Sequence, residues 1–241
     1  MKVQFLQMLS ALALITVTAT ASAGENAMTK NTASYIEMQA ATGQTEAFAD
    51  FLTGAASIVR ETEPGTEMWF ALQAEDTLAI FDVFTSEESR DAHFSGVVAG
   101  ALNENAGVLV DGGWDAGVVA RINNSTVLSA KAPFGLSDAS TATYIKIEAA
   151  PGQGDQLEAL LSAAGSIVAG TEPKTLFWAA LRIDETNFAI FDVFADESGR
   201  EAHFAGTVAG LLKEKAPLLV AGGWDDGVAA NVRNFDILGI K

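Results

Sequence analysis

The hexapeptide AIFDVF occurs twice in this 241-residue chain, at residues 79–84 and again at 189–194. Each copy has the length and the apolar content of a buried strand, with a single aspartate inside it. Downstream of each copy lies an Ala-His-Phe triplet, at 92–94 and 202–204, and these two triplets contain the only histidines of the chain. Repetition of the whole local setting indicates an internal duplication.

The duplication extends over nearly the whole chain after its first 33 residues. The segment that begins at Ser34 aligns with the one that begins at Thr143, and the tetrapeptide GGWD recurs late in each copy. The offset between the copies grows from 109 to 110 residues near Asn187, which places a one-residue insertion in a turn between two predicted strands. We predict a signal peptide at 1–23, a first repeat at 34–131, a linker at 132–142 and a second repeat at 143–241.

Hydrophobic periodicity predicts the same order of elements in both copies. A short alternating strand comes first, and an amphipathic helix that ends at Pro64 or Pro173 follows it. Two strands then form a hairpin, and a second helix begins where Thr85 and Glu88 have the spacing of a capping box, with Asp196 in the other copy. A short strand closes the unit. The order β-α-β-β-α-β is the ferredoxin-like arrangement of the α+β class.

Two such units in one chain imply how they pack. A four-stranded sheet with both helices on one face leaves its other face uncovered, and pairing the two uncovered faces buries both. We therefore predict that the repeats pack sheet against sheet as an intramolecular dimer, a closed α+β barrel.

Composition excludes several classes of function. The formal net charge of −17 argues against nucleic acid and anionic membrane surfaces as partners, since both attract Lys and Arg. The absence of cysteine excludes disulfides, thiolate metal sites and cysteine nucleophiles. One histidine per repeat cannot form a three-histidine zinc site within a unit, so no metal site is predicted.

The first residues have the pattern of a secretory signal. Lys2 gives a positive start, an apolar stretch runs from Met8 to Val17, and Ala21-Ser22-Ala23 ends it with small residues. The apolar stretch is about half of the ~20 residues that a membrane span needs. We expect cleavage near Gly24, a periplasmic or secreted protein, and no membrane association afterwards; an uncleaved anchor is the alternative.

The candidate site joins the aspartate of each hexapeptide to the histidine that follows it. Asp82 and Asp192 lie mid-strand and need a partner if they are buried. His93 and Arg90 are one helical turn apart and are both candidate partners, as are His203 and Arg200 in the second copy. The pair has two interpretations: an ion pair that fixes the helix, or an acid/base pair in which a carboxylate orients the imidazole.

Glycines and aromatic residues surround these candidates. Gly96 and Gly100 follow His93 on the predicted helix, where they either allow close helix–sheet packing or leave room for a ligand. Trp69 and Trp178 occupy matching places in the second strand, as core residues or as a platform for a ring. The tryptophans of the two GGWD tetrapeptides are interpreted as packing residues.

These motifs resemble the antibiotic biosynthesis monooxygenase family. The resemblance covers each repeat nearly end to end, and the Glu-Pro turn before the strand tryptophan and the strand acid followed by Ala-His are its most specific pieces. It implies a dimeric α+β barrel with one pocket per repeat, and it implies oxidation of quinols or aromatic compounds by dioxygen without metal or flavin cofactor. The asparagine that accompanies tryptophan and histidine in haem-degrading relatives is not evident on the first strand.

The resemblance also implies roles for individual residues. It implies catalytic roles for the paired histidines and aspartates: His93, His203, Asp82 and Asp192. The residues expected to bind a small aromatic or quinol-like substrate are Trp69, Trp178, Phe84, Phe194, Arg90 and Arg200. No cofactor is implied, because a deprotonated phenol or hydroquinone can reduce dioxygen itself. A binding module that only sequesters an apolar or aromatic ligand, and a purely structural role, remain as alternatives.

Overall fold

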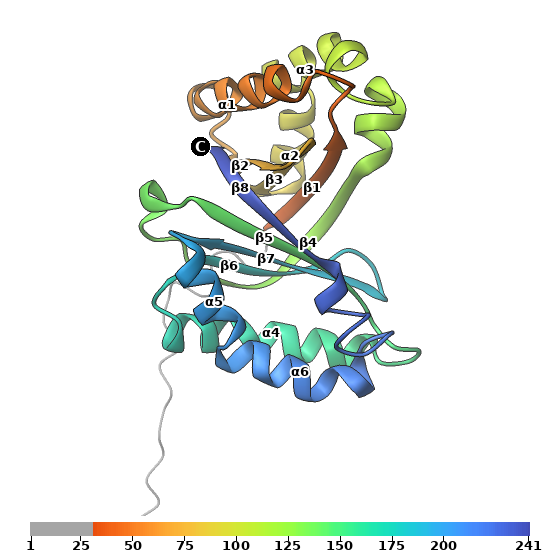
Figure 1. Cartoon of the computed structure of the whole chain (residues 1–241), viewed down its shortest axis with the longest axis vertical. Coiled ribbons are helices and arrows are strands. Elements are labelled where there is room, and N and C mark those ends of the chain that lie inside the picture. The colour runs from red at the N-terminus through yellow and green to blue at the C-terminus, as the bar shows by residue number, and fades with distance from the viewer. Residues whose placement is uncertain (1–30) are drawn as a thin grey trace, which may run out of the picture.

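The computed structural model describes residues 31–241 as two α+β units joined into one barrel (Figure 1). The strands are β1 (Thr32–Gln39), β2 (Thr66–Ala74), β3 (Thr77–Phe84), β4 (Ile122–Lys131), β5 (Thr141–Glu148), β6 (Thr175–Arg182), β7 (Asn187–Phe194) and β8 (Val232–Ile240). The α-helices are α1 (Thr45–Thr62), α2 (Glu87–Phe94), α3 (Val97–Leu109), α4 (Gly154–Thr171), α5 (Glu197–Phe204) and α6 (Thr207–Leu219). The predicted α+β class is confirmed, and the expected signal peptide lies outside the described residues.

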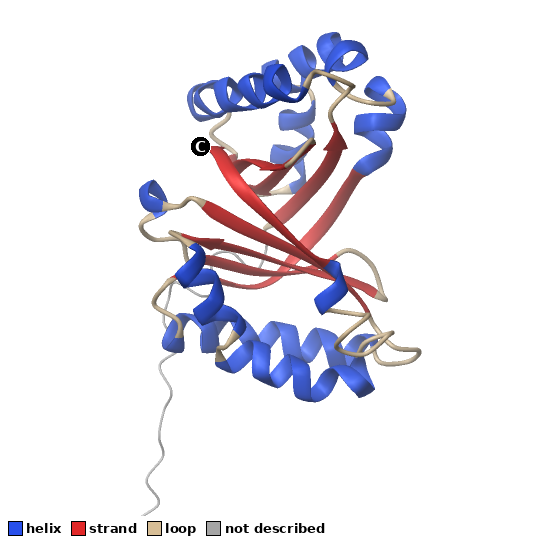
Figure 2. Ribbon diagram, viewed as in Figure 1, coloured by secondary structure: helices blue, strands red, loops and turns tan. Residues whose placement is uncertain are grey.

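The eight strands form a closed barrel. Their order is β1-β3-β2-β8-β5-β7-β6-β4, and neighbouring strands in each sheet are antiparallel. The helices of each repeat cover the outer face of its own sheet, so the two helical layers lie on opposite sides of the molecule (Figure 2). The inner faces of the two sheets meet, which confirms the predicted sheet-to-sheet packing of the repeats.

The last strand of each repeat belongs to both sheets. The first half of β4 pairs with β1 of its own repeat, and its second half pairs with β6 of the other repeat. In the same way β8 pairs first with β5 and then with β2. Because each final strand crosses to the other unit, its terminal residues come to lie beside the other repeat's elements.

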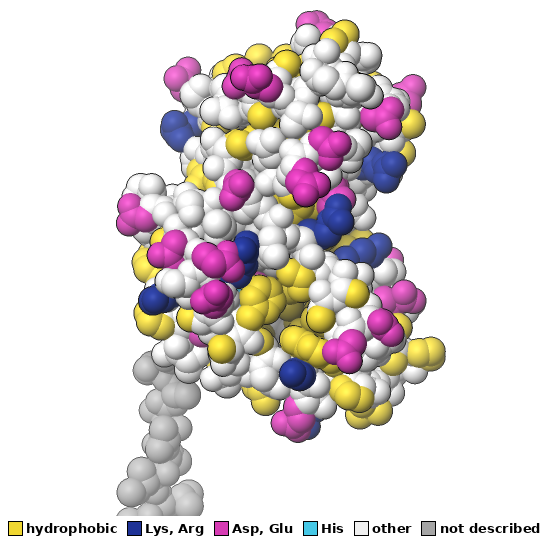
Figure 3. All heavy atoms as spheres, viewed as in Figure 1, with side chains coloured by type: hydrophobic (Ala, Val, Ile, Leu, Met, Phe, Trp, Pro, Cys, Tyr) yellow, Lys and Arg dark blue, Asp and Glu magenta, His cyan; other side chains and the backbone are white. Residues whose placement is uncertain are grey.

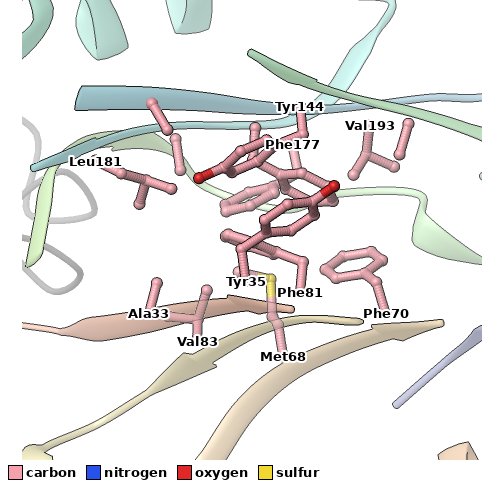
Figure 4. Close-up of a cluster of buried hydrophobic side chains, with 14 of the residues drawn as sticks. Ala33, Tyr35, Met68, Phe70, Phe81, Val83, Tyr144, Phe177, Leu181 and Val193 are labelled. Atoms are coloured by element: carbon pink, nitrogen blue, oxygen red, sulfur yellow. The ribbon is translucent and has the colours of Figure 1, made fainter. Parts of the chain in front are cut away.

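The barrel interior is an aromatic core. Phe81 and Phe191, one from each hexapeptide, stack with ring centroids 3.8 Å apart, and Tyr35 stacks on Tyr144 at 3.7 Å (Figure 4). Side chains alternate along a strand, so alternate residues of AIFDVF face this core. The intervening residues face the helices, where Ile80 joins a second apolar cluster. That alternation places the aspartate between sheet and helices.

The second helix of each repeat is not continuous, and here the prediction was wrong. α2 ends at Phe94 and α3 begins at Val97, because Gly96 has extended backbone (φ −80°, ψ −180°) and serves as the N-cap of α3. Val97, the first residue of α3, is 61% exposed. The cap of α2 is also shifted by one residue, since Ser86 rather than Thr85 accepts from the Ser89 amide, whereas Asp196 caps α5 as expected.

The GGWD segments form the turns that follow the helices. Gly112 and Gly113 have positive φ values of 81° and 64°, a backbone region that glycine adopts without strain. Trp114 is half-buried against the core between sheet and helices, as is Trp224 in the second repeat. Among residues 31–241, no helix is both long enough and apolar enough to span a bilayer.

Candidate functional site

Asp82 lies in a polar row on the helix-facing side of the first sheet. It is opposite Ser34 of β1 and Trp69 of β2 in the strand register, and Ser34 in turn donates a hydrogen bond to Asn124 of β4 (2.8 Å). The matching row of the second sheet is Asn234, Thr143, Asp192 and Trp178. Asp82 is fully buried, and neither its carboxylate oxygens nor the Trp69 indole N–H has a hydrogen-bond partner among the described residues.

An imidazole lies between Asp82 and a second carboxylate. His93, at the end of α2, places Nε2 3.7 Å from Asp82 Oδ2 and Nδ1 2.5 Å from Glu63 Oε2. His203 has the same two distances to Asp192 and Glu172. The longer separation exceeds the donor–acceptor distance of a hydrogen bond, so Nε2 lies near the aspartate but is not hydrogen-bonded to it. The structure thus brings the predicted aspartate and histidine together in both repeats.

The glutamates were missed in the sequence. Glu63 follows the last residue of α1, Glu172 follows the last residue of α4, and a proline comes next in both cases. From the sequence, an acid at such a helix end is expected to be an ordinary solvent-exposed side chain. The Thr-Glu-Pro triplet that both copies share was the available signal. In the structure Glu63 also accepts from the Thr66 hydroxyl (2.9 Å), so the turn after the helix holds its carboxylate toward the imidazole.

Gly96 and Gly206 allow that carboxylate to approach. A Cβ atom on Gly96 would lie 2.9 Å from Glu63 Oε1, and one on Gly206 would lie 2.6 Å from Glu172 Oε1. By contrast, Gly100 and Gly210 have no atom within 4 Å of such a Cβ. Close packing therefore explains the first glycine of each pair and leaves the second without a steric reason.

Each site is contacted by a lysine at or directly after the end of the other repeat's last strand. Lys131, at the end of β4, donates from Nζ to the Glu172 carbonyl oxygen (2.6 Å) and is buried. Lys241, which follows β8, donates to the Glu63 carbonyl (2.7 Å) and to the Thr66 carbonyl. The exchanged strands therefore fix the backbone that carries each glutamate.

The surroundings of the cluster raise the pKa values of both the aspartate and the histidine. Burial raises the pKa of Asp82 to about 7, although His93 pulls it down. Burial alone would lower the pKa of His93, but Asp82 and Glu63 together outweigh burial and raise it. Asp192 and His203 behave in the same way, with an Asp192 pKa of about 7. The aspartate and the histidine that face each other therefore both bind a proton more readily than they would in water.

The other predicted residues take different places. Phe84 and Phe194 lie against the imidazoles, with ring centroids 5.3 and 5.5 Å away. The arginines do not reach the aspartates, so their prediction as partners was wrong: Arg90 pairs with Asp91 (3.6 Å) and Arg200 pairs with Glu197. Both side chains are only 17% exposed, and Arg200 lines a cleft beside α5 that also contains Asn234 of the polar row.

Three clefts adjoin these clusters. One cleft in each repeat, of about 350 Å³ and 300 Å³, is lined by the histidine, the glutamate and the first glycine. A larger cleft of about 480 Å³ lies in the second repeat between α5 and the turn before β8, and Figure 3 shows hydrophobic side chains gathered around this hollow. We call it the aromatic cleft; its lining includes Phe204, Trp224, Val232, Arg200 and Asn234.

The aromatic cleft and the buried cluster are connected through the polar row. Asn234 lines the cleft and accepts a hydrogen bond from Thr143 (3.1 Å), which is opposite Asp192 in the sheet. Asp192 itself is fully buried behind them. Within residues 31–241, no three His, Asp or Glu side chains converge as metal ligands.

Comparison with known proteins places the fold. No family model matches the chain, and no curated protein matches it. A "putative monooxygenase" from Fusobacterium nucleatum matches over 88% of this chain and 94% of its own, with a TM-score of 0.70 and 13% identity. A "putative monooxygenase" from Lactobacillus acidophilus matches over 86% and 93%, with a TM-score of 0.68 and 10% identity.

A further match has the length of one repeat. A Nitrosomonas europaea protein of unknown function is 32% identical over 43% of this chain and 93% of its own, with a TM-score of 0.39. The fold assignment depends on the two matches that cover most of this chain and most of their own. The chain therefore has the α+β barrel fold of these two solved structures, built from two repeats of a single polypeptide.

Proposed function

We propose that this protein is a cofactor-independent monooxygenase that oxidises a small phenol or hydroquinone with dioxygen, outside the cytoplasm. The observation that carries the proposal is the buried cluster of one imidazole between two carboxylates, with an aspartate pKa of about 7. An ordinary ion pair that only fixed a helix would not require an aspartate without hydrogen bonds.

The imidazole and the glutamate are the members of each cluster that line a cleft. His93 and His203 line clefts, whereas Asp82 and Asp192 are wholly buried behind them. Glu63 engages Nδ1, which leaves Nε2 to accept a phenolic proton. The resulting imidazolium lies between two carboxylates, which stabilise its charge in a site that is shielded from water.

The proton transfer makes the phenol able to reduce dioxygen. The phenolate gives one electron to O₂, and the superoxide and phenoxyl radical that result combine into a carbon–oxygen bond. The imidazolium protonates the outer oxygen of this peroxide. Loss of the ring C–H proton then breaks the O–O bond and leaves a quinone carbonyl, while the departing hydroxide and that proton form water. One phenol and one O₂ give one quinone and one water.

The second candidate function, a non-catalytic binding module, is favoured by a different observation. The aromatic cleft is the largest of the three and is lined by Phe204, Trp224 and Arg200, which suit a ring with a polar substituent. Its lining does not include His203 or Asp192. A ligand in this cleft would be held without contact with the base.

Oxygen uptake distinguishes the two functions. Purified protein treated with chelator is mixed with a panel of hydroquinones and phenols in an oxygen electrode, and tryptophan fluorescence is recorded in parallel. Uptake of one O₂ per quinone formed supports the monooxygenase. Saturable quenching of tryptophan with no uptake by any member of the panel supports the binding module and contradicts the enzyme.

A further inference from the structure

A fourth cleft lies where the two repeats meet, away from both histidine clusters. It has a volume of about 490 Å³, and β1 and β5 with the segments that lead into β4 and β8 form its walls. Tyr35 and Tyr144 of the barrel core are among its lining residues. We call it the axial cleft, because each repeat contributes the matching elements to it.

Positive charge is concentrated in the axial cleft. Arg121, Lys146 and Arg233 all line it, which is three of the 14 Lys and Arg residues in a chain of net charge −17. Glu37 is the only acidic residue of its lining. Figure 3 shows Lys and Arg side chains gathered at the waist between the two units, on a surface that is otherwise rich in acids.

Only one of the three cations is neutralised. Arg233 donates to Oε1 of Glu37 (2.7 Å) and the Tyr35 hydroxyl donates to Oε2 (2.7 Å), so both oxygens of this carboxylate already accept a hydrogen bond. Neither Arg121 nor Lys146 has an ion-pair partner anywhere in residues 31–241. Two unpaired cations in one concave site attract an anion.

The two repeats differ in the cleft although they agree in the core. Tyr35 and Tyr144 occupy matching positions, as do Phe81 and Phe191. Beside them, however, Glu37 of the first repeat corresponds to Lys146 of the second. Arg121 likewise corresponds to Asn231, and Asn123 corresponds to Arg233. Each half therefore supplies one arginine from a different place, and the second half adds a lysine where the first has an acid.

We propose that the axial cleft binds a small dianion whose charge is carried on carboxylate or phosphate oxygens. The guanidinium of Arg121 offers paired N–H donors to such oxygens, and Lys146 adds a point charge. The Asn123 and Asn231 side chains complete a polar lining. This site is separate from the proposed base, so a ligand here neither needs nor reports oxidation.

The test is calorimetric titration with two probes, succinate and inorganic phosphate, at constant ionic strength. The internal repeat suggests the variants. Lys146→Glu and Arg121→Asn each introduce the residue that the other repeat has at the matching position, where the same backbone conformation accommodates it. Lys215→Glu is the matched control, because it makes the same charge change at an exposed lysine on α6.

We expect at least one probe to bind saturably, and Lys146→Glu and Arg121→Asn each to weaken it about tenfold or more, while Lys215→Glu changes affinity by less than about twofold. Binding of both probes supports a general oxyanion site, and binding of one identifies which oxyanion it prefers. Failure of both probes to bind the unaltered protein overturns the proposal. Equal weakening by Lys215→Glu and Lys146→Glu also overturns it, since the effect would then reflect net charge alone.

Discussion

Replacing both buried aspartates with asparagine should flatten the dependence of stability on pH. Asp82 and Asp192 each have a folded-state pKa of about 7 against an ordinary value of 3.8, because burial disfavours the charged form. The folded protein therefore binds more protons than the unfolded chain between these values. The stability that this provides is complete below about pH 4 and is lost as the pH rises through 7.

The size of the effect follows from the shift. One pKa unit corresponds to 1.36 kcal/mol, so a rise from 3.8 to about 7 corresponds to roughly 4 kcal/mol per site between pH 4 and pH 8. The histidines act in the same direction, since their raised pKa values also make stability fall as the pH rises past their ordinary value of 6.5. Asp82→Asn with Asp192→Asn removes the larger share of this dependence.

The pH dependence of stability is measured by urea unfolding, monitored by tryptophan fluorescence at several pH values from about 4 to 8. The unaltered protein should lose free energy of unfolding steadily across this range, and the double variant should lose several kcal/mol less. Glu104→Gln with Glu214→Gln is the control, because it removes two exposed carboxylates from matching positions of α3 and α6. If the control flattens the profile as much as the aspartate variant does, general repulsion in this acidic protein is responsible and the reasoning is wrong.

Three further results are expected from the geometry of the sites. Gly206→Ala should destabilise the fold by about 1–3 kcal/mol because its Cβ would press on a buried carboxylate, whereas Gly210→Ala, with open space around it, should stabilise by up to ~1 kcal/mol. Chemical denaturation measures the free energy of unfolding of both variants, and an equal change in the two would contradict the reasoning. Lys131→Met should raise the imidazole pKa of His203 and leave the pKa of His93 unchanged, since Lys131 lies beside the His203 cluster and lowers only the pKa of His203. Proton NMR of the chain's two histidines measures both pKa values, and an unchanged pKa of His203 would refute the cross-repeat contact. His93→Ala with His203→Ala should lower the free energy of unfolding by about 1–3 kcal/mol, because buried carboxylates lose their partner, and should abolish oxygen uptake. A loss of stability with unchanged turnover per folded molecule would mean that the histidines have only a structural role.

Much of the fold could be predicted because the sequence repeats itself. Two copies of AIFDVF with period-two alternation indicate buried strands, and two units with uncovered sheet faces require a partner surface. The exchange of β4 and β8 was not predictable in the same way. Each of these strands pairs with one repeat through its first half and with the other through its second half. Nothing in a short alternating run says how many partners it has.

The same limit applies to the site. The link between Asp82 and His93 could be predicted because they are close in sequence and a buried acid needs a partner. Glu63 lies 30 residues before the histidine and reaches it only through the packing of α1 against the rest of the unit. Arg90 looked equivalent to His93 from spacing alone, but a helix that is only eight residues long and ends before Gly96 presents a single residue, His93, to the buried side.

The most direct test of the central claim is oxygen uptake with the best phenol or hydroquinone of the panel, compared between the unaltered protein and Asp82→Asn with Asp192→Asn at neutral pH. If the buried aspartate and histidine form the base, uptake per folded molecule should fall by about a hundredfold or more in the double variant, the usual contribution of general base catalysis. The control that removes two exposed carboxylates should keep full activity. Undiminished uptake by a folded Asp82→Asn, Asp192→Asn protein would contradict the claim.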